Sequence, residues 1–240
     1  MVEDWISKIQ KTEVCDLFGN LKISTKSITL FAGENTIGKT ATCLHLSKFA
    51  INNKFVVLYF DTEQKLIDRP EPNLLNVFLQ ENFELFKKNF YIEHSLFKQI
   101  IKDKDGIETD EVDKVHFENK ISEINPSLVI IDSIYTSFTN FFTESRRRAK
   151  AIGNFMRYLR NLMIEKDLAI IITTKIGRIV KEEQEQNVIL GGQELLYNCD
   201  TKAKMKMIDN QLQEKKIVFS VDNQEEFVLI LDFGGIIKKI

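Results

Sequence analysis

The sequence predicts an α/β fold with a mostly parallel central sheet that is flanked by helices and extended by antiparallel strands near the C-terminus. Short apolar runs alternate along the chain with segments of helical spacing; the runs are 28–31, 55–60, 128–131 and 168–172. Each run is continuous, as in parallel strands that are covered on both faces. Each run leads into glycine or polar residues, and ligands bind where the carboxyl ends of parallel strands meet.

Composition and charge indicate a globular protein without a large basic surface. The 240 residues are 43% hydrophobic and carry a formal net charge of −2, so any basic patch for nucleic acid must be local. Cys15, Cys43 and Cys199 lack metal-ligand spacing and cannot all pair, which favours a reduced, cytoplasmic setting. No apolar run approaches about 18 residues, so we expect no membrane span. We expect an N-terminal segment over residues 1–21 and a core over residues 22–240.

The first apolar run leads into residues 33–40, GENTIGKT, which fit the phosphate-binding pattern G-x-x-x-x-G-K-[ST]. A helix is predicted directly after them, over 41–50. The two glycines let several backbone N–H groups point at one anion, and the helix N-terminus adds the positive end of its dipole. Lys39 should therefore reach the β and γ phosphates, and the Thr40 hydroxyl should hold Mg²⁺. The alternative is a chance glycine turn.

Acidic residues follow the second and third apolar runs. Asp61 and Glu63 come directly after the second run, which would place both near the nucleotide; the alternative is a solvated acidic turn. Asp132 ends the third run in the Walker B pattern, where a carboxylate orders the water shell of Mg²⁺. A helix-capping residue is the alternative for Asp132.

The chain between these two runs predicts further elements. An amphipathic helix is expected over 71–88 and a strand over 90–94. Charged residues dominate 97–124, for which we expect a lid-like insertion followed by a helix.

A helix over 145–165 carries the densest basic cluster of the chain. Apolar residues at i, i+3, i+4 and i+7 predict its buried face. The basic residues in this region are Arg146, Arg147, Arg148, Lys150, Arg157 and Arg160. They follow aromatic residues within 135–142, and basic residues beside aromatic rings suit single-stranded nucleic acid. The alternative is a solvated helix face above core aromatics.

The last third of the chain should complete the sheet. Lys175 follows the strand of the fourth apolar run, and the polar residues 176–190 are expected to be a mobile loop. Lysines alternate with apolar residues over 201–207, as in a half-exposed strand. The runs 217–221 and 227–231 are expected to form an antiparallel hairpin.

The order of these motifs resembles the RecA/RadA recombinase core, over about residues 22–240. The segments that carry the resemblance are GENTIGKT (33–40), VVLYFDTE (56–63), LVIIDS (128–133), AIIITTK (169–175), LGGQ (190–193) and FVLILDFGGI (227–236). Because no helical DNA-binding domain precedes the core, the chain is most similar to short paralogues of this family, such as archaeal RadB.

The resemblance implies a weak, Mg²⁺-dependent ATPase with ATP as its nucleotide. It implies that Glu63 is the general base that orients the attacking water, with Lys39 and Lys175 also in the catalytic site. Lys175 stands where the family has a glutamine that senses the γ-phosphate. Thr40 and Asp132 are the implied Mg²⁺ residues. The implied nucleotide contacts are Gly33, Glu34, Asn35, Thr36, Ile37, Gly38, Lys39, Thr40, Ala41 and Arg69.

The resemblance also implies single-stranded DNA as a partner. The implied DNA-binding residues are Arg146, Arg147, Arg148 and Lys150, with the three arginines in a first DNA-binding loop and 176–190 as a second. The function expected from it is a recombinase paralogue that assists a partner recombinase or repair protein in homologous recombination or DNA repair. An oligomer is compatible with this interpretation. The alternative is a RecA-fold regulatory or helicase-like ATPase that acts through protein contacts without binding DNA.

Overall fold

The computed structural model describes residues 11–66, 83–181, 184–210, 214–223, 225–232 and 237–239. The helices are α2 (Lys39–Asn52), α4 (Phe83–Asn89), α5 (Val115–Ile124), α6 (Ile134–Thr139), α7 (Ser145–Glu165) and α8 (Gln193–Tyr197). The strands are β1 (Glu13–Asp16), β2 (Lys22–Ser24), β3 (Ser27–Gly33), β4 (Val57–Asp61), β5 (Phe90–Glu93), β6 (Ile100–Lys102), β7 (Glu108–Val112), β8 (Leu128–Asp132), β9 (Ala169–Lys181), β10 (Gln184–Ile189), β11 (Thr201–Asn210), β12 (Glu214–Val221), β13 (Glu225–Asp232) and β14 (Ile237–Lys239).

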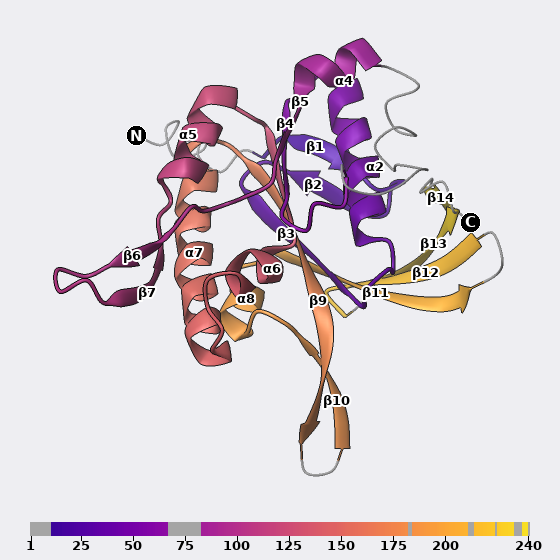
Figure 1. Cartoon of the computed structure of the whole chain (residues 1–240). Helices are drawn as coiled ribbons and strands as arrows, with labels where there is room; N and C mark the ends of the chain where they lie inside the picture. The colour runs from indigo at the N-terminus through magenta and orange to yellow at the C-terminus, as the bar shows by residue number, and fades with distance from the viewer. Residues whose placement is uncertain are drawn as a thin grey trace, which may run out of the picture.

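Ten of the described strands form one sheet, with helices on both faces (Figure 1). The order across it is β14-β13-β12-β11-β3-β9-β8-β4-β5, and β10 pairs with β9 alone. The strands from β11 to β5 are parallel, whereas β12, β13 and β14 are antiparallel to their neighbours. The predicted α/β class, with a mostly parallel sheet and a C-terminal antiparallel extension, is therefore confirmed.

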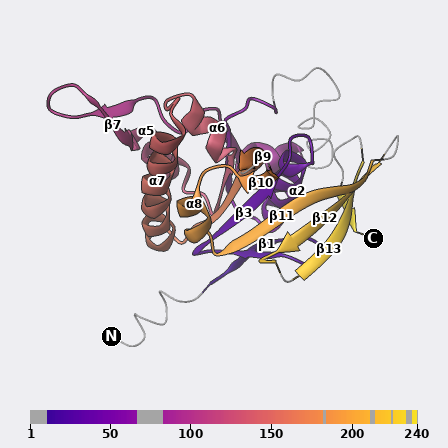
Figure 2. The same cartoon turned by 90° about the horizontal axis from the view of Figure 1, so that it is seen from below.

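The central strands are buried along their whole length because an apolar layer covers each face of the sheet. Every residue of β3, β4 and β8 is buried, which is the reason that these strands have continuous apolar sequences. One layer combines α2 with side chains from β11, β12 and β13. The other layer consists mainly of α5, α6 and α7. Figure 2 shows β11, β12 and β13 continuing the sheet beyond β3.

Helix α7 spans the predicted range, 145–165. Its apolar positions, including Ile152, Phe155 and Leu159, are fully buried against the sheet. The expected insertion before it is an antiparallel hairpin of β6 and β7, which projects from the body of the molecule (Figure 1), and α5 then follows. The predicted order of an insertion followed by a helix is therefore present, and a lid-like role of the hairpin stays a prediction.

The expectation of a mobile loop over 176–190 is wrong. Strand β9 continues to Lys181 and turns back into β10, so that the two form an antiparallel hairpin that projects from the sheet (Figure 1). Five β-branched residues favour this extended backbone; they are Ile176, Ile179, Val180, Val188 and Ile189. Their polar neighbours obscured the strand pattern in the sequence.

Two other sequence predictions extend beyond the described residues. Only the end of the helix expected over 71–88 is described, as α4, and Arg69 lies outside the described residues.

Strand β1 pairs with β2, and Val14 and Leu17 belong to the same apolar layer as α2. The division of the chain at residue 21 stays a prediction. Among the described residues, no helix is both long enough and apolar enough to span a membrane.

Candidate functional site

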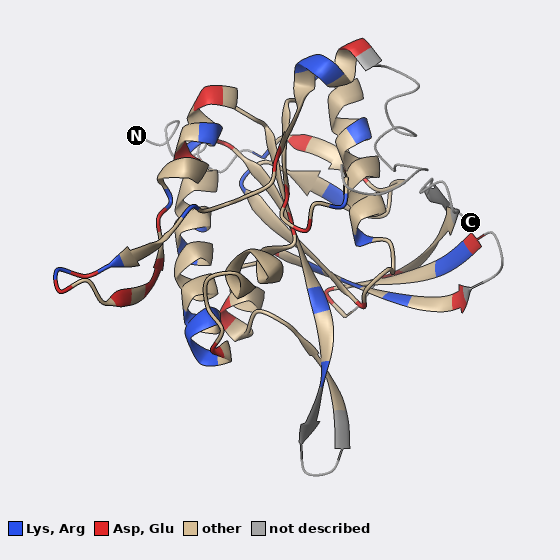
Figure 3. Cartoon of the chain, viewed as in Figure 1, with Lys and Arg blue, Asp and Glu red and all other residues tan. Residues whose placement is uncertain are grey.

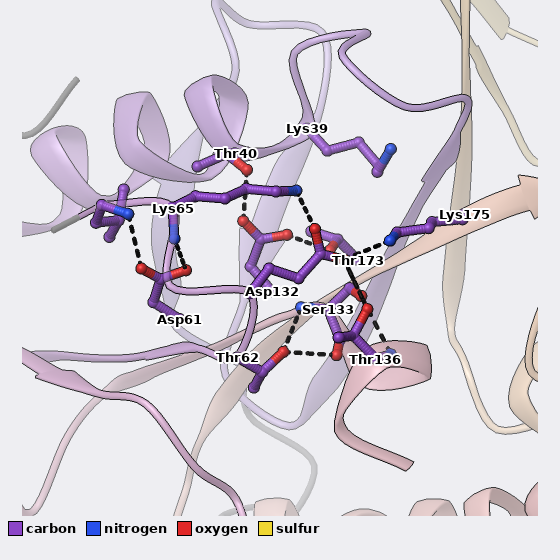
Figure 4. A network of polar contacts seen from close by, with 12 residues as sticks. Lys39, Thr40, Asp61, Thr62, Lys65, Asp132, Ser133, Thr136, Thr173 and Lys175 are labelled. Carbon is purple, nitrogen blue, oxygen red and sulfur yellow. Dashed lines mark hydrogen bonds and ion pairs between the residues drawn. The ribbon is translucent and has the colours of Figure 1, made fainter. Parts of the chain in front are cut away.

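The carboxyl ends of β3, β4 and β8, together with the middle of β9, bring the predicted nucleotide-site residues to one edge of the parallel strands (Figure 4). Gly33 at the end of β3 is in register with Lys175 of β9. Asp61 at the end of β4 is in register with Asp132 of β8. Because β9 lies between β3 and β8, these groups share one short edge. The sequence expectation that the ends of the apolar runs meet is confirmed.

Residues 34–38 form a loop that connects β3 to α2, so the predicted order of strand, loop and helix is present. Gly38, directly before α2, has a φ of +106°, a conformation that favours glycine. A Cβ atom at Gly38 would lie 2.6 Å from Leu231 Cδ2, and one at Gly33 would lie 3.0 Å from the carbonyl oxygen of Met205. Lys215 Nζ also donates to the Thr36 carbonyl oxygen at 3.1 Å. The C-terminal strands therefore pack closely against this loop.

Lys39 lies inside the loop and is only 6% exposed. Its ammonium group donates to the carbonyl oxygens of Gly33, at 2.9 Å, and Glu34, at 2.6 Å. Burial, and after it the nearby Lys65 ammonium, lower the pKa of Lys39 to about 8. A cation in this position is costly to bury alone, so an anionic ligand in the loop would stabilise it.

Asp132 is fully buried and accepts hydrogen bonds from three hydroxyl groups. Thr40 Oγ1 donates to Asp132 Oδ2 at 2.6 Å, and Tyr59 donates to the same oxygen at 2.9 Å. Thr173 Oγ1 donates to Oδ1 (Figure 4). Helix α6 is capped by Ser133 instead, whose hydroxyl accepts from the Thr136 backbone N–H. The helix-capping alternative for Asp132 is therefore wrong.

The pair formed by Thr40 and Asp132 fits a magnesium ion in its chemistry. Mg²⁺ prefers oxygen ligands and is usually held by one or two carboxylates together with phosphate oxygens and water. A hydroxyl and a carboxylate from different elements meet here. Among the described residues, no group of three or more His, Cys, Asp or Glu side chains could hold a metal by itself. Phosphate oxygens would have to complete such a site.

Asp61 and Glu63 are not in a solvated turn, so that alternative is wrong. Asp61 is fully buried, and its carboxylate accepts from the backbone N–H groups of Lys65, at 3.0 Å, and Leu66, at 2.7 Å. This contact closes the turn after β4 that carries Glu63. Asp61 therefore has a structural role in shaping the site.

Glu63 lies in a network of cations and hydroxyl groups, and its partners Lys65, Ser133, Thr136 and Lys175 are labelled in Figure 4. Its Oε2 atom lies 2.5 Å from Lys65 Nζ, and its Oε1 atom lies 2.9 Å from Lys175 Nζ. Ser133 Oγ and Thr136 Oγ1 also donate to Oε1, at 3.0 Å and 2.6 Å. Burial alone would raise the pKa of Glu63, but hydrogen bonds from Lys65, Thr136 and Lys175 outweigh it and lower the pKa to about 2.

Sequence reasoning missed several members of this site. Tyr59 and Thr173, which bind Asp132, lie within predicted strands and carried no separate signal. Thr136 lies one turn after the predicted strand end, on α6. Lys65 was also missed, although it stands two residues after Glu63, because a lone lysine after a strand matches no motif. Only the folded chain brings these side chains together.

The predicted DNA-binding arginines begin helix α7, so their placement in a loop is wrong. Along the chain, α7 follows β8 and precedes β9, and these two strands are parallel neighbours in the sheet. The first turn of α7 therefore lies on the side of the carboxyl strand ends (Figures 1 and 3). Arg146 is exposed there. The guanidinium of Arg148 stacks 4.6 Å above the Tyr135 ring and donates to the Phe142 carbonyl oxygen. Arg147 lies 5.7 Å above the Phe142 ring, so two basic side chains of the cluster lie beside aromatic rings, as expected.

Two members of this basic cluster are paired with a carboxylate of the β6–β7 hairpin. Asp110 of β7 lies 2.9 Å from Arg147 Nε and 2.8 Å from Lys150 Nζ. These contacts lower the pKa of Asp110 through hydrogen bonds from Lys150 and Arg147. Phe138 and Phe142 are buried in the core, as the alternative reading of this region proposed.

Fold and site together define an α/β protein with a glycine-containing loop and a carboxylate network at the carboxyl edge of a mostly parallel sheet, an architecture consistent with a RecA-like fold. No family model matches the chain. The chain is similar to the DNA repair and recombination protein RadB of Archaeoglobus fulgidus, with 26% identity over 157 residues. The match covers 64% of this chain and 63% of the archaeal protein, which is less than two thirds of its length. This similarity supports a relation to the RecA/RadA family.

Proposed function

We propose that the chain is a weak, Mg²⁺-dependent ATPase of the RecA/RadA type that binds single-stranded DNA and assists a partner recombinase or repair protein. The observation that carries this proposal is the hydrogen bond between Thr40 and Asp132. It joins the helix after the glycine loop to the end of a distant strand, at the edge where Lys39 and Glu63 also lie. The similarity to a protein named for DNA repair and recombination supports the proposed role in recombination or repair.

In this proposal each side chain of the edge has a separate task. The backbone N–H groups of the loop and of Ala41 bind the phosphates, and Lys39 exchanges its carbonyl partners for phosphate oxygens. Thr40 and Asp132 would hold Mg²⁺, which when bound would supply positive charge to neutralise the phosphates. Glu63 orients the attacking water. The adenine contact proposed for Arg69 lies outside the described residues.

The surroundings of Glu63 support the slow turnover in this proposal. A general base acts best when its pKa is near the working pH. Two ammonium groups and two hydroxyl groups stabilise the ionised form of Glu63 instead and hold its pKa at about 2. Glu63 in this arrangement is a poor proton acceptor, and the hydrogen bond from Lys175 is one of the contacts that lower its pKa.

The proposed DNA-binding surface is the start of α7, with Arg146, Arg147, Arg148 and Lys150. Its position on the side of the carboxyl strand ends supports coupling to the nucleotide site. A second candidate function is a RecA-fold regulatory or helicase-like ATPase that acts through protein contacts without DNA. The observation that favours it is that Arg147 and Lys150 already pair with Asp110.

Two binding measurements test the proposal. Calorimetry of ATP with Mg²⁺ should show binding to the wild type and none to Lys39→Ala. Anisotropy of labelled single-stranded DNA, at several salt concentrations with and without ATP, should show binding that weakens as salt rises. ATP binding without any DNA binding would favour the second function. Unchanged ATP affinity in Lys39→Ala would remove the nucleotide proposal altogether.

A further inference from the structure

We propose that Glu63 and the terminal phosphate of a bound nucleotide compete for Lys65. Lys65 holds Glu63 in a paired state when no terminal phosphate is present, and it releases Glu63 by moving to that phosphate. The inference rests on the proposed nucleotide site and deepens it. It makes Lys65 a positioning residue that distinguishes a nucleoside triphosphate from a diphosphate.

The geometry assigns one lysine to each oxygen of Glu63. Lys65 pairs with Oε2, and Lys175 pairs with Oε1, which also accepts from Ser133 and Thr136. Among the described residues, Lys65 is the group that pairs with Glu63 Oε2. Removing Lys65 would therefore free one carboxylate oxygen while the other stays fixed by its three donors. Glu63 would keep its position and gain a lone pair for a water molecule.

Lys65 is built to move only its side chain. Its backbone N–H donates to Asp61 Oδ1 at 3.0 Å, so the turn that carries it is fixed to the end of β4. The lysine side chain is a flexible four-carbon chain with a compact charge at its end. It is 25% exposed, whereas the Glu63 side chain is 11% exposed. The ammonium group can therefore change partners without a change in the backbone.

The charges at the edge favour an added polyanion. The edge holds three ammonium groups and two carboxylates close together, and Lys65, Lys175, Glu63 and Asp132 each act on the charge of Lys39. Apart from Asp61, whose carboxylate accepts from backbone N–H groups of its own turn, three cations therefore face two anions among the described groups of this edge. A terminal phosphate carries more charge than a carboxylate and offers more acceptor oxygens, so it can attract an ammonium group away from Glu63.

The test measures binding and needs no turnover. Calorimetry with Mg²⁺ compares ADP with an ATP analogue whose β–γ bridge is an imido group. The proteins are the wild type, Glu63→Gln, Lys65→Met and the double variant. Glu63→Gln removes the competing charge, so it should strengthen binding of the analogue by about tenfold and change ADP binding by less than about twofold. In the Lys65→Met background, the same Gln substitution should strengthen analogue binding by less than about threefold.

Three controls keep the result specific to Lys65. Lys65→Arg keeps the charge and should retain the preference for the analogue over ADP. Lys54→Met removes an exposed lysine beyond the far end of α2 and should leave both affinities unchanged. Thermal unfolding of each variant verifies that it is folded before binding is compared.

Two results would overturn the inference, and they differ from a failure of the proposed function. An unchanged ratio of analogue to ADP affinity in Glu63→Gln would show that no competition exists. A full gain that persists in the Lys65→Met background would assign the competition to Lys175 and not to Lys65. A wild-type protein that binds neither nucleotide would instead remove the proposed function, and the inference with it.

Discussion

Glu63 receives hydrogen bonds or ion pairs from Lys65, Ser133, Thr136 and Lys175. These donors come from three separate parts of the chain, so a single carboxylate links the turn after β4 to α6 and β9. Such a buried network fixes the orientation of the group at its centre. The predictions at the scale of single residues therefore concern Glu63.

Glu63→Gln should bind ATP and turn it over much more slowly. The amide keeps the shape of the side chain but cannot accept a proton, and loss of a general base typically lowers a rate by about 10²–10⁴-fold. Steady-state hydrolysis and calorimetric binding would be measured on the same preparation. Turnover at the wild-type rate would place the base at another residue.

The stability contributed by Glu63 should depend on pH in acid. Its pKa is about 2 in the folded protein, against an ordinary value of 4.5. Between these values the unfolded chain binds more protons, so stability falls as pH falls. The contribution is fully present above pH 4.5, and on the order of 3 kcal/mol is lost toward pH 2.

Urea unfolding of the wild type and Glu63→Gln at several pH values measures this contribution. The difference in unfolding free energy between them should stay constant above about pH 5 and shrink as the pH falls toward 2. A difference that does not change with pH would mean that the Glu63 pairs add no net stability.

At the scale of elements, the loop before α2 packs against β12 and β13, which lie far from it in the sequence. Leu231 of β13 and Ile217 of β12 both lie against Gly38. Gly38 therefore serves both the backbone conformation of the loop and the packing of the antiparallel extension.

Gly38→Ala should destabilise the protein more than Gly106→Ala. Both glycines have a positive φ, which costs an alanine about 1–2 kcal/mol. At Gly38 the new Cβ would also lie 2.6 Å from Leu231 Cδ2, whereas nothing lies within 4 Å of one at Gly106. The clash should add about 1–3 kcal/mol. Denaturant unfolding of both variants measures the difference, and equal costs would mean that the loop tolerates the added atom.

The start of α7 is the element that should carry any DNA affinity. Replacing Arg146, Arg147 and Arg148 by alanine removes up to three phosphate contacts, so the salt slope for single-stranded DNA should fall by up to about 2 units. Lys166→Ala is the matched control, because it removes a charge about 30 Å away at the other end of the same helix. Equal slopes for the wild type and the triple variant would leave these arginines as a solvated helix face.

At the scale of the whole molecule, strand β9 connects the site to a projecting arm. Lys175 pairs with Glu63 and lies midway along β9, and the strand then continues into the hairpin with β10. A force on the hairpin therefore acts on the strand that holds Lys175.

The wild type should hydrolyse ATP slowly and respond weakly to single-stranded DNA, and Lys175→Gln should turn over faster. The substitution removes one cation from Glu63 and replaces it with a neutral side chain, so the carboxylate becomes a better proton acceptor. Hydrolysis rates with and without single-stranded DNA measure both effects. Fast hydrolysis by the wild type that DNA strongly stimulates would contradict this account of Lys175.

The sequence predicted the sheet well because burial on both faces requires continuous apolar runs. Those runs also located Gly33, Asp61 and Asp132, since each ends one of them. The hairpin of β9 and β10 was missed because it projects from the sheet, where no apolar face is required. The pairing of Asp110 with Arg147 was missed because a contact between distant surface charges has no local pattern.

The position of β3 has a consequence for the order in which the chain folds during its synthesis. Its two neighbours in the sheet are β9 and β11, which begin at residues 169 and 201. At ribosomal speed, the roughly 190 residues between Thr40 and Leu231 take on the order of 10–40 s to make. A nascent chain that has reached residue 195 contains the entire loop sequence and still lacks one neighbour of β3. The part of the site that is synthesised first would therefore be completed only after β11, β12 and β13 have left the ribosome, and the proposed nucleotide binding would begin only then.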